Sequence, residues 1–349
     1  MNKSKVLILY TGGTFGMVPE HSKDLSSNLI PGSLEDLGKY MPALEEDGFF
    51  TNSGVSITYE PLGEPKDSSD FVPADWILIT KRIEEDYDNY DAFILIQGTD
   101  TMAYTASALS FMIDGLAKPI IITGSQLPIS HPRTDAISNL TNSIYLAAYK
   151  SFDLENISEV LICFNDDLLR GNRATKYSTN DLEGFESPNF NSLASLEERI
   201  IVNKRALVKG KGTEFRTQCK MEDRVVIVPL FPGYSPNYLR NMVNDMDIKG
   251  IVFRAFGAGN YFMSPEFIEV LEEARAKEII MLNTTQCYQG SVHYGKYITN
   301  KGMAECGVIN GEDLTLEASI TKMMWCLGNY SYSNAISILG SSIKGEMTN

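Results

Sequence analysis

Threonine, aspartate and lysine side chains recur in short polar segments of this chain, and together they could carry out nucleophilic hydrolysis. Hydrolysis of an amide needs a hydroxyl or thiol nucleophile, a proton acceptor, donors for the oxyanion and groups that bind the charged ends of the substrate. The segment QGTDTM supplies Thr99 and Asp100, and TGGT at 11–14 supplies Thr14. A lysine that is partly desolvated in a cleft can give up its proton and serve as base. Because the serine hydrolase elbow GxSxG is absent, threonine hydroxyls with an Asp and Lys pair are the candidates.

Each polar segment also has a purely structural interpretation. Asp100 lies where it could cap the helix predicted after it, and TGGT is compatible with an ordinary strand-to-helix turn capped by threonine. Asp67 and Asp70 flank two serines ahead of the helix that Pro73 would start. The residues alone therefore leave capping and catalysis open.

Most of these polar segments follow a short apolar run with the character of a strand. Such runs occupy residues 6–10, 55–61, 92–96, 119–123 and 160–164, and a helix-like segment spans 34–46. The carboxyl ends of parallel strands meet at one edge of a sheet, and two adjacent glycines in TGGT would let that turn approach a ligand closely. The pattern predicts a mainly parallel sheet with its functional groups gathered along one edge.

A charged stretch that is poor in core positions divides the chain. We predict an N-terminal α/β domain at 1–195, a linker at 196–222 and a C-terminal α/β domain at 223–349. The last part has strand-like runs at 225–229, 249–253 and 279–283, helix-like segments at 236–246 and 265–277, and one or two helices after residue 314. The expected fold class is therefore α/β, with a mainly parallel, helix-flanked sheet in the first domain.

Composition excludes several classes of partner. The net charge of −15 argues against nucleic acid, because neutralising phosphates needs a basic face. Too few apolar residues follow the basic start MNKSK for a signal peptide or a membrane span, so we expect no membrane partner and a cytoplasmic location. Five widely spaced cysteines without a CxxC pair fit reduced thiols, and three distant histidines without HExxH predict no metal site.

Taken together, the motifs resemble the bacterial L-asparaginases, most closely the cytoplasmic type I form. The similarity rests on YTGGTFGM at 10–17, DSSD at 67–70, QGTDTMAYTASALSFM at 97–112, TGSQ at 123–126, RGNRATK at 170–176 and GAGN at 257–260. It covers nearly the whole chain, from residue 6 to about 325. It implies a larger N-terminal and a smaller C-terminal α/β domain, and an intimate homodimer that completes each active site, with pairing of dimers into a tetramer left open. It also implies hydrolysis of the small molecule L-asparagine to L-aspartate and ammonia without a cofactor.

The resemblance assigns roles by motif. Thr14 would be the nucleophile that forms an aspartyl ester, and Lys176 would complete a second triad with Thr99 and Asp100. The loop at 67–69 would hold the α-amino and α-carboxylate groups, and Ser125 would lie near the side-chain amide. The implied substrate-binding residues are Gly13, Asp67, Ser68, Ser69, Thr99, Asp100, Ser125 and Asn260.

One departure concerns the partner of the nucleophile. Members of the family often carry a tyrosine in the lid after TGGT, whereas residues 15–39 contain none and Leu29 stands at the corresponding place. We expect Tyr297, in the segment HYGKY, to take over that catalytic role. A buried core position is the alternative.

Type I members are also described as being activated by asparagine at a second site. Arg254 matches the arginine associated with that site, and Thr175 and Cys287 match its neighbours. A guanidinium can hold a carboxylate through two hydrogen bonds, whether it belongs to an effector or to an acidic side chain at an interface. Both interpretations stay open.

Two other functions remain possible at this stage. One is a related amidase, either a glutaminase or the ammonia-generating subunit of a tRNA-dependent amidotransferase, although the latter usually brings an extra N-terminal domain and here the first strand is predicted from Val6. The other is an amino-acid sensor without catalysis, against which the joint presence of Thr14, Thr99, Asp100 and Lys176 argues.

Overall fold

The structure is a computed structural model of the chain, and it describes residues 4–20, 28–31, 38–45, 47–208, 214–262, 264–294 and 298–348. The chain divides into two compact units. Met1–Ser187 and Asn191–Thr217 form the N-terminal unit, whereas Pro188–Phe190 and Gln218–Asn349 form the C-terminal unit. No helix among the described residues is long and apolar enough to cross a membrane.

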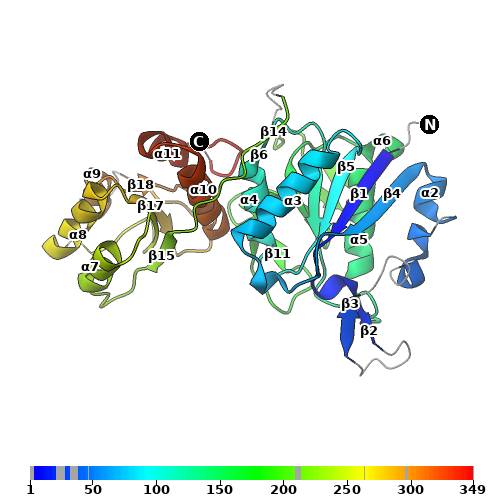
Figure 1. The fold of residues 1–349 in the computed structure, drawn as a ribbon, viewed down its shortest axis with the longest axis horizontal. Coiled ribbons are helices and arrows are strands. Elements are labelled where there is room, and N and C mark those ends of the chain that lie inside the picture. The colour runs from blue at the N-terminus through cyan, green and yellow to red at the C-terminus, as the bar shows by residue number, and fades with distance from the viewer. Residues whose placement is uncertain are drawn as a thin grey trace. The chain divides into compact units, whose positions relative to one another are not determined.

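An eight-stranded sheet forms the centre of the N-terminal unit (Figure 1). Its strand order is β13-β12-β9-β8-β7-β5-β1-β4, and every neighbouring pair from β8 to β4 is parallel. The strands are β1 (Ser4–Tyr10), β4 (Val55–Pro61), β5 (Ala92–Ile96), β7 (Ile120–Thr123), β8 (Val160–Phe164), β9 (Asp167–Arg170), β12 (Ala194–Leu196) and β13 (Ile200–Val202). Three two-stranded sheets join β2 (Met17–Pro19) with β3 (Leu29–Pro31), β6 (Ile113–Asp114) with β14 (Arg216–Thr217), and β10 (Thr175–Lys176) with β11 (Phe185–Glu186).

Helices cover both faces of this sheet. They are α2 (Phe49–Asn52), α3 (Pro73–Asp86), α4 (Met102–Met112), α5 (Ala136–Ala147) and α6 (Tyr149–Phe152), with the 3₁₀ turns η1 (Thr14–Gly16), η2 (Pro42–Leu44), η3 (Ser68–Asp70) and η4 (Gly171–Arg173). Figure 1 shows α3 and α4 on one face and α5 on the other. Every residue of β5, β7 and β8 is buried, which explains why these strands read as unbroken apolar runs.

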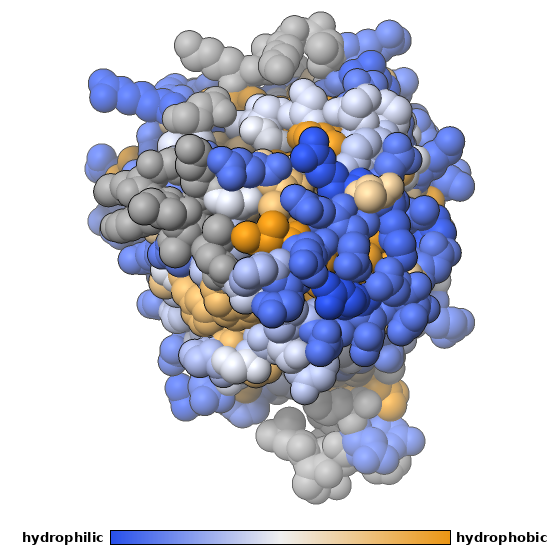
Figure 2. Space-filling view, turned by 90° about the vertical axis from the view of Figure 1, so that its left-hand side faces the viewer, coloured by the Kyte–Doolittle hydropathy of each residue, from blue (hydrophilic) through white to orange (hydrophobic). Residues whose placement is uncertain are grey.

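The C-terminal unit is a smaller, fully parallel sheet between helices. The strand order is β15 (Val225–Pro229), β16 (Gly250–Ala255), β17 (Ile280–Thr285) and β18 (Ile309–Asn310). The helices are α7 (Pro236–Asp245), α8 (Pro265–Ala276), α9 (Ile298–Glu305), α10 (Leu316–Asn329) and α11 (Tyr332–Leu339). In Figure 1, α7 and α8 lie on one side of this sheet and α10 and α11 on the other. Figure 2 shows the face that carries α7 and α8, where hydrophilic side chains dominate and apolar ones form small separate areas.

Polar contacts hold the last described residues of the chain against the rest of the C-terminal unit. Lys322 on α10 donates to the Glu346 carboxylate over 2.6 Å, and neither side chain is exposed. Two residues later, the backbone N–H and the hydroxyl of Thr348 donate to the two carboxylate oxygens of Asp313 over 2.7 and 2.6 Å. We call residues 340–348 the C-terminal segment.

The predicted fold class is confirmed: a mainly parallel sheet flanked by helices, followed by a smaller α/β unit. The short antiparallel strands β9, β12 and β13 were not predicted. Of the helix predicted at 34–46, residues 34–37 and 46 lie outside the described residues, residues 38–40 are helical, and η2 occupies 42–44. The predicted linker at 196–222 contains β13 and β14, so its structure is more regular than a charged linker sequence suggests. The boundaries 1–195, 196–222 and 223–349 stay a prediction.

Candidate active site

The polar segments that follow β1, β4, β5 and β7 lie at one edge of the N-terminal sheet and are joined by backbone hydrogen bonds. The N–H of Thr11 donates to Ile96 O, and the N–H of Lys66 donates to Thr11 O, both over 3.0 Å. The N–H of Gln97 donates to Thr123 O over 3.0 Å. Since these bonds fix the strand ends relative to one another, the side chains that follow them start from a rigid edge.

Two glycines allow the turn after β1 to pack against its neighbours. Gly12 and Gly13 have φ of 119° and 85°, which side chains rarely permit. A Cβ added to Gly13 would lie 2.3 Å from the nitrogen of Gly98, so there is no room for one. Thr14 follows with an exposed side chain that makes no capping bond, while Phe15 is fully buried and anchors the turn. The hydroxyl of Thr14 is therefore presented at the edge, and it does not cap η1.

The loop after β4 contacts the loop after β5 through Ser68. Ser68 is buried, and its hydroxyl oxygen accepts the N–H of Asp100 over 3.2 Å while its carbonyl accepts the hydroxyl of Thr101 over 2.7 Å. Asp67 caps η3, accepting both the N–H and the hydroxyl of Ser69 over 2.8 Å. These two bonds, and the charge of Lys176 nearby, lower the pKa of Asp67. Asp67 therefore caps η3, whereas the N-cap of α3 is Val72, and the Asp67 carboxylate stays ionised next to Lys176.

Lys176 joins a hydroxyl and a carboxylate. From β10 its ammonium donates to Thr99 Oγ1 over 2.8 Å and to Asp100 Oδ1 over 2.5 Å. The lysine side chain is 16% exposed and the Asp100 side chain 63% exposed, so the group lies at the surface of the edge with its amine sheltered. The N-cap of α4 is Thr101, and Asp100 makes no capping bond. A hydroxyl, an ammonium and a carboxylate in one hydrogen-bonded group can exchange a proton with a substrate or a water placed against Thr99.

Ser125 lies after β7 at the same edge, but its hydroxyl is used locally. It is buried and donates to Leu127 O over 2.6 Å. Asp135 holds this turn by accepting the N–H groups of Gln126 and Leu127 over 2.9 and 3.0 Å. Sequence reasoning missed Asp135, which directly precedes α5, a position where aspartate is common.

Arg254 and Cys287 both bond to Thr285 within the C-terminal unit. The guanidinium donates to the carbonyl oxygens of Thr285 and Gln286 over 3.2 Å, and the N–H of Cys287 donates to the hydroxyl of Thr285 over 2.9 Å. In the described part of the chain these bonds of Arg254 run to carbonyls, and no carboxylate holds it. The Cys287 side chain is exposed.

The remaining predicted site residues are spread over the chain. Asn260 lies in the C-terminal unit, where its backbone pairs with Phe256, and Thr175 lies next to Lys176 on β10 of the N-terminal unit. Tyr297 lies outside the described residues. Among the residues that are described, no three His, Cys, Asp or Glu side chains could hold a metal ion together.

Comparison with known protein families accounts for both units. Residues 5–208 match "Asparaginase, N-terminal", and residues 224–338 match "Glutaminase/Asparaginase C-terminal domain". The chain belongs to the asparaginase family. The edge of the N-terminal sheet with Thr14, Thr99 and Lys176 therefore lies in the N-terminal part of an asparaginase-family protein.

Individual known proteins resemble the chain over nearly its full length. L-asparaginase 1 of Escherichia coli K12 is 36% identical, covering 100% of this chain and 99% of that protein. The crystal structure of L-asparaginase I from Vibrio cholerae superposes with a TM-score of 0.87 at 33% identity, covering 99% of this chain and all of that one. A glutamyl-tRNA(Gln) amidotransferase polypeptide of Methanosphaera stadtmanae is 30% identical, covering 99% of this chain and 77% of that protein.

Proposed function

We propose that the protein is an L-asparaginase that hydrolyses L-asparagine to L-aspartate and ammonia through a threonine ester, without a metal or another cofactor. The observation that carries the proposal is the hydrogen-bonded group of Thr99, Asp100 and Lys176, which Ser68 ties to the loop that holds Asp67. Family membership and the similarity to proteins named L-asparaginase support the same activity.

In the proposed reaction, Thr14 Oγ1 attacks the carbonyl carbon of the substrate's side-chain amide. The hydroxyl proton passes to the leaving nitrogen, the C–N bond breaks and ammonia leaves, so that an aspartyl ester of Thr14 remains. Water then attacks the ester carbonyl, and its proton passes through the group of Thr99, Lys176 and the Asp100 carboxylate to Thr14 Oγ1. The ester C–O bond breaks, so aspartate leaves and the Thr14 hydroxyl is restored. Tyr297 is proposed as the hydroxyl that polarises Thr14.

The substrate's charged ends define the rest of the proposed site. The ionised Asp67 and the carboxylate of Asp100 suit the α-ammonium group, and the hydroxyls of the 67–69 loop suit the α-carboxylate. Gly13 permits close approach of the substrate to the backbone. Ser125 would accompany the side-chain amide, and Asn260 is a further proposed substrate-binding residue.

A coupled ammonia assay tests this function. The wild type should release ammonia from L-asparagine in the presence of EDTA, and Thr14→Ala should abolish release and the covalent intermediate in a mass spectrum. Thr51→Ala serves as the matched control, because Thr51 is an exposed threonine of the same unit on α2. Loss of activity in EDTA that zinc restores, or an acyl group mapped to Thr99, would contradict the proposal.

Sequence similarity to an amidotransferase suggests a second possible activity. That relative is named for glutamyl-tRNA(Gln), and the chain also matches a domain described as glutaminase/asparaginase. Assaying L-glutamine beside L-asparagine separates the two: a higher kcat/KM with glutamine would favour the glutaminase or amidotransferase function. Binding of either amide without ammonia release would indicate a sensor.

We further propose that asparagine activates the enzyme at a site built from Arg254, Thr175 and Cys287, in a cytoplasmic homodimer. Because Arg254 is held by carbonyl oxygens, its positive charge is available to an effector carboxylate. A coupling of about 1–3 kcal/mol changes apparent affinity roughly 5- to 150-fold. Velocity should therefore rise sigmoidally with asparagine concentration, and Arg254→Ala should make this curve hyperbolic. Arg275→Ala, on α8 of the same unit, is the control and should leave the curve sigmoidal. A hyperbolic wild type would remove the effector site. Mass measurement in solution decides between a dimer and a pair of dimers.

A further inference from the structure

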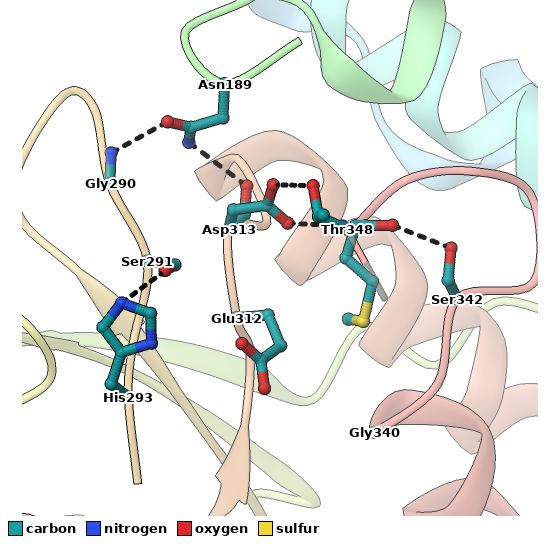
Figure 3. Close-up of a pocket in the computed structure, with 10 residues that line it drawn as sticks. Asn189, Gly290, Ser291, His293, Glu312, Asp313, Gly340, Ser342 and Thr348 are labelled. Carbon is teal, nitrogen blue, oxygen red and sulfur yellow. Dashed lines mark hydrogen bonds between the residues drawn. The ribbon is translucent and has the colours of Figure 1, made fainter. Parts of the chain in front are cut away.

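A cavity of about 530 Å³ lies in the C-terminal unit, and none of the residues in the proposed mechanism or effector site lines it (Figure 3). One wall is the segment 290–293 after β17, and another is the turn at 312–313 after β18. The C-terminal segment and Asn189 complete it. This volume falls in the range of roughly 300–1,000 Å³ that is typical of small-molecule sites.

The first wall presents a hydrogen-bonded pair of polar side chains. Ser291 and His293 are two residues apart, and Ser291 Oγ lies 3.1 Å from His293 Nε2. The backbone beneath them is fixed, because the N–H of Val292 donates to Glu312 O over 2.9 Å and the N–H of His293 donates to Ala258 O over 3.1 Å. The N–H of Gly290 donates to Asn189 Oδ1 over 2.8 Å. The pair is therefore held in place by a rigid loop.

The opposite wall presents the carboxylate of Glu312. Its Oε1 accepts an N–H of Asn310 over 2.5 Å, and Figure 3 shows the Glu312 carboxylate on the side of the cavity that faces His293. Desolvation and the neighbouring charge of Asp313 raise the pKa of Glu312, while His293 opposes the shift. Glu312 also holds a φ of 48°, uncommon for a residue other than glycine. Its carboxylate is thus aimed across the cavity in surroundings that favour a positively charged partner.

The lining residues decide which kind of ligand fits. They include two carboxylates but no lysine or arginine, so a phosphate or carboxylate group would be repelled. The two oxygens of Asp313 are taken by Thr348, which leaves Glu312 as the carboxylate that a ligand can reach. A metal ion is disfavoured, since the described residues hold no group of three metal-ligating side chains. A cationic organic group remains.

We propose that this cavity binds a small organic molecule through a primary ammonium group, which donates hydrogen bonds to Glu312 and to the hydroxyl of Ser291. The ring of His293 keeps the serine hydroxyl oriented, and the aliphatic part of the ligand lies along the C-terminal segment. Because the Lys322–Glu346 pair holds that segment, the cavity exists before the ligand arrives.

Calorimetric titration of the full chain tests the proposal with n-butylamine and 1,4-diaminobutane as probes, and with 1-butanol and butyrate as neutral and anionic analogues. The amines should bind saturably and the analogues should not. Glu312→Gln should weaken amine binding at least about tenfold, since it removes a charge-assisted hydrogen bond. Glu266→Gln removes the same charge from an exposed position on α8 of the same unit and should leave the affinity unchanged.

Three results would overturn it. They are the absence of saturable amine binding, equal weakening by Glu312→Gln and Glu266→Gln, and displacement of the amines by potassium chloride at equal concentration, which would indicate an inorganic cation site. Should Glu312→Gln unfold in a thermal melt, Ser291→Ala replaces it, with a weakening of at least about tenfold expected from the loss of one hydrogen bond from the ammonium group. An unchanged affinity in a folded Ser291→Ala would equally refute the proposed contacts.

Discussion

Replacing Lys176 by methionine should separate activity from stability in the N-terminal unit. Methionine keeps most of the length of the side chain but cannot donate to Thr99 Oγ1 or Asp100 Oδ1, which now lie 2.8 and 2.5 Å from the ammonium. Substrate binding should be partly retained, because the loop at 67–69 is held by Ser68 and by its own bonds rather than by the lysine.

The two effects differ in size. A positioned acid or base contributes about 10²–10⁴-fold to a rate, so kcat/KM for asparagine should fall by that factor, or about 2.7–5.5 kcal/mol in activation free energy. The ion pair itself is worth about 0–1 kcal/mol, because the Asp100 side chain is 63% exposed. In a unit of about 200 residues this corresponds to a loss of at most about 2–4 °C in Tm.

Steady-state ammonia release and calorimetric melting measure the two effects on one preparation. Lys150→Met is the matched control, since Lys150 forms a comparable 2.6 Å pair with Asp91. Asp91 directly precedes β5, whereas Thr99 and Asp100 follow it, so the control pair lies at the opposite end of this strand from the candidate site. It should lower Tm by a similar amount and leave kcat/KM unchanged. A Lys176→Met enzyme with wild-type kcat/KM, or one whose lost activity follows a loss of several kcal/mol in stability, would refute the catalytic role.

Two further predictions concern buried groups. Glu346→Gln should destabilise the C-terminal unit by about 3–5 kcal/mol, because the buried ammonium of Lys322 loses its counterion. Combining Lys322→Met with Glu346→Leu should recover most of that loss. Urea denaturation measures the stability of both variants, and equal stability of Glu346→Gln and the wild type would contradict the burial of the pair. Iodoacetamide at pH 8 should label the exposed Cys287 in the native protein and spare Cys163 and Cys326, since burial raises the pKa of both thiols to about 12. Mass spectrometry locates the label, and rapid native labelling of Cys163 would show that its strand opens.

The strand β5 shows why a strand that is buried on both faces can be predicted from the sequence. β5 was predicted at 92–96 and is found there, because a parallel strand covered on both sides reads as an unbroken apolar run. β9 was missed because it ends in Arg170, whose charge suggests a turn. In the structure that guanidinium is buried and bonded to Glu159 over 2.6 Å, a pairing that a linear pattern does not reveal.

The same contrast holds for the candidate site. The sequence predicted that the segments after β1, β4 and β5 lie together, because the carboxyl ends of parallel strands share one edge of a sheet. Lys176 could not be placed in this way, because it comes from the two-residue strand β10, 77 positions from Thr99, and only the family resemblance connected them. The hydrogen bonds of Arg254 to backbone carbonyls could not be predicted either, since a residue of any type carries a backbone carbonyl. The catalytic and effector roles stay predictions.

The short segment Pro188–Phe190 limits how this protein can be taken apart. It belongs to the C-terminal unit although the residues on both sides of it belong to the N-terminal unit, and Asn189 accepts the N–H of Gly290 and donates to Asp313 O. A gene fragment that starts at Gln218 would therefore lack one of its own structural parts, and the loop at 290–293 would lose its fastening. Expression of the unit as an independent module calls for a tethered copy of residues 188–190. A simple cut at the boundary at 217 would leave that loop open.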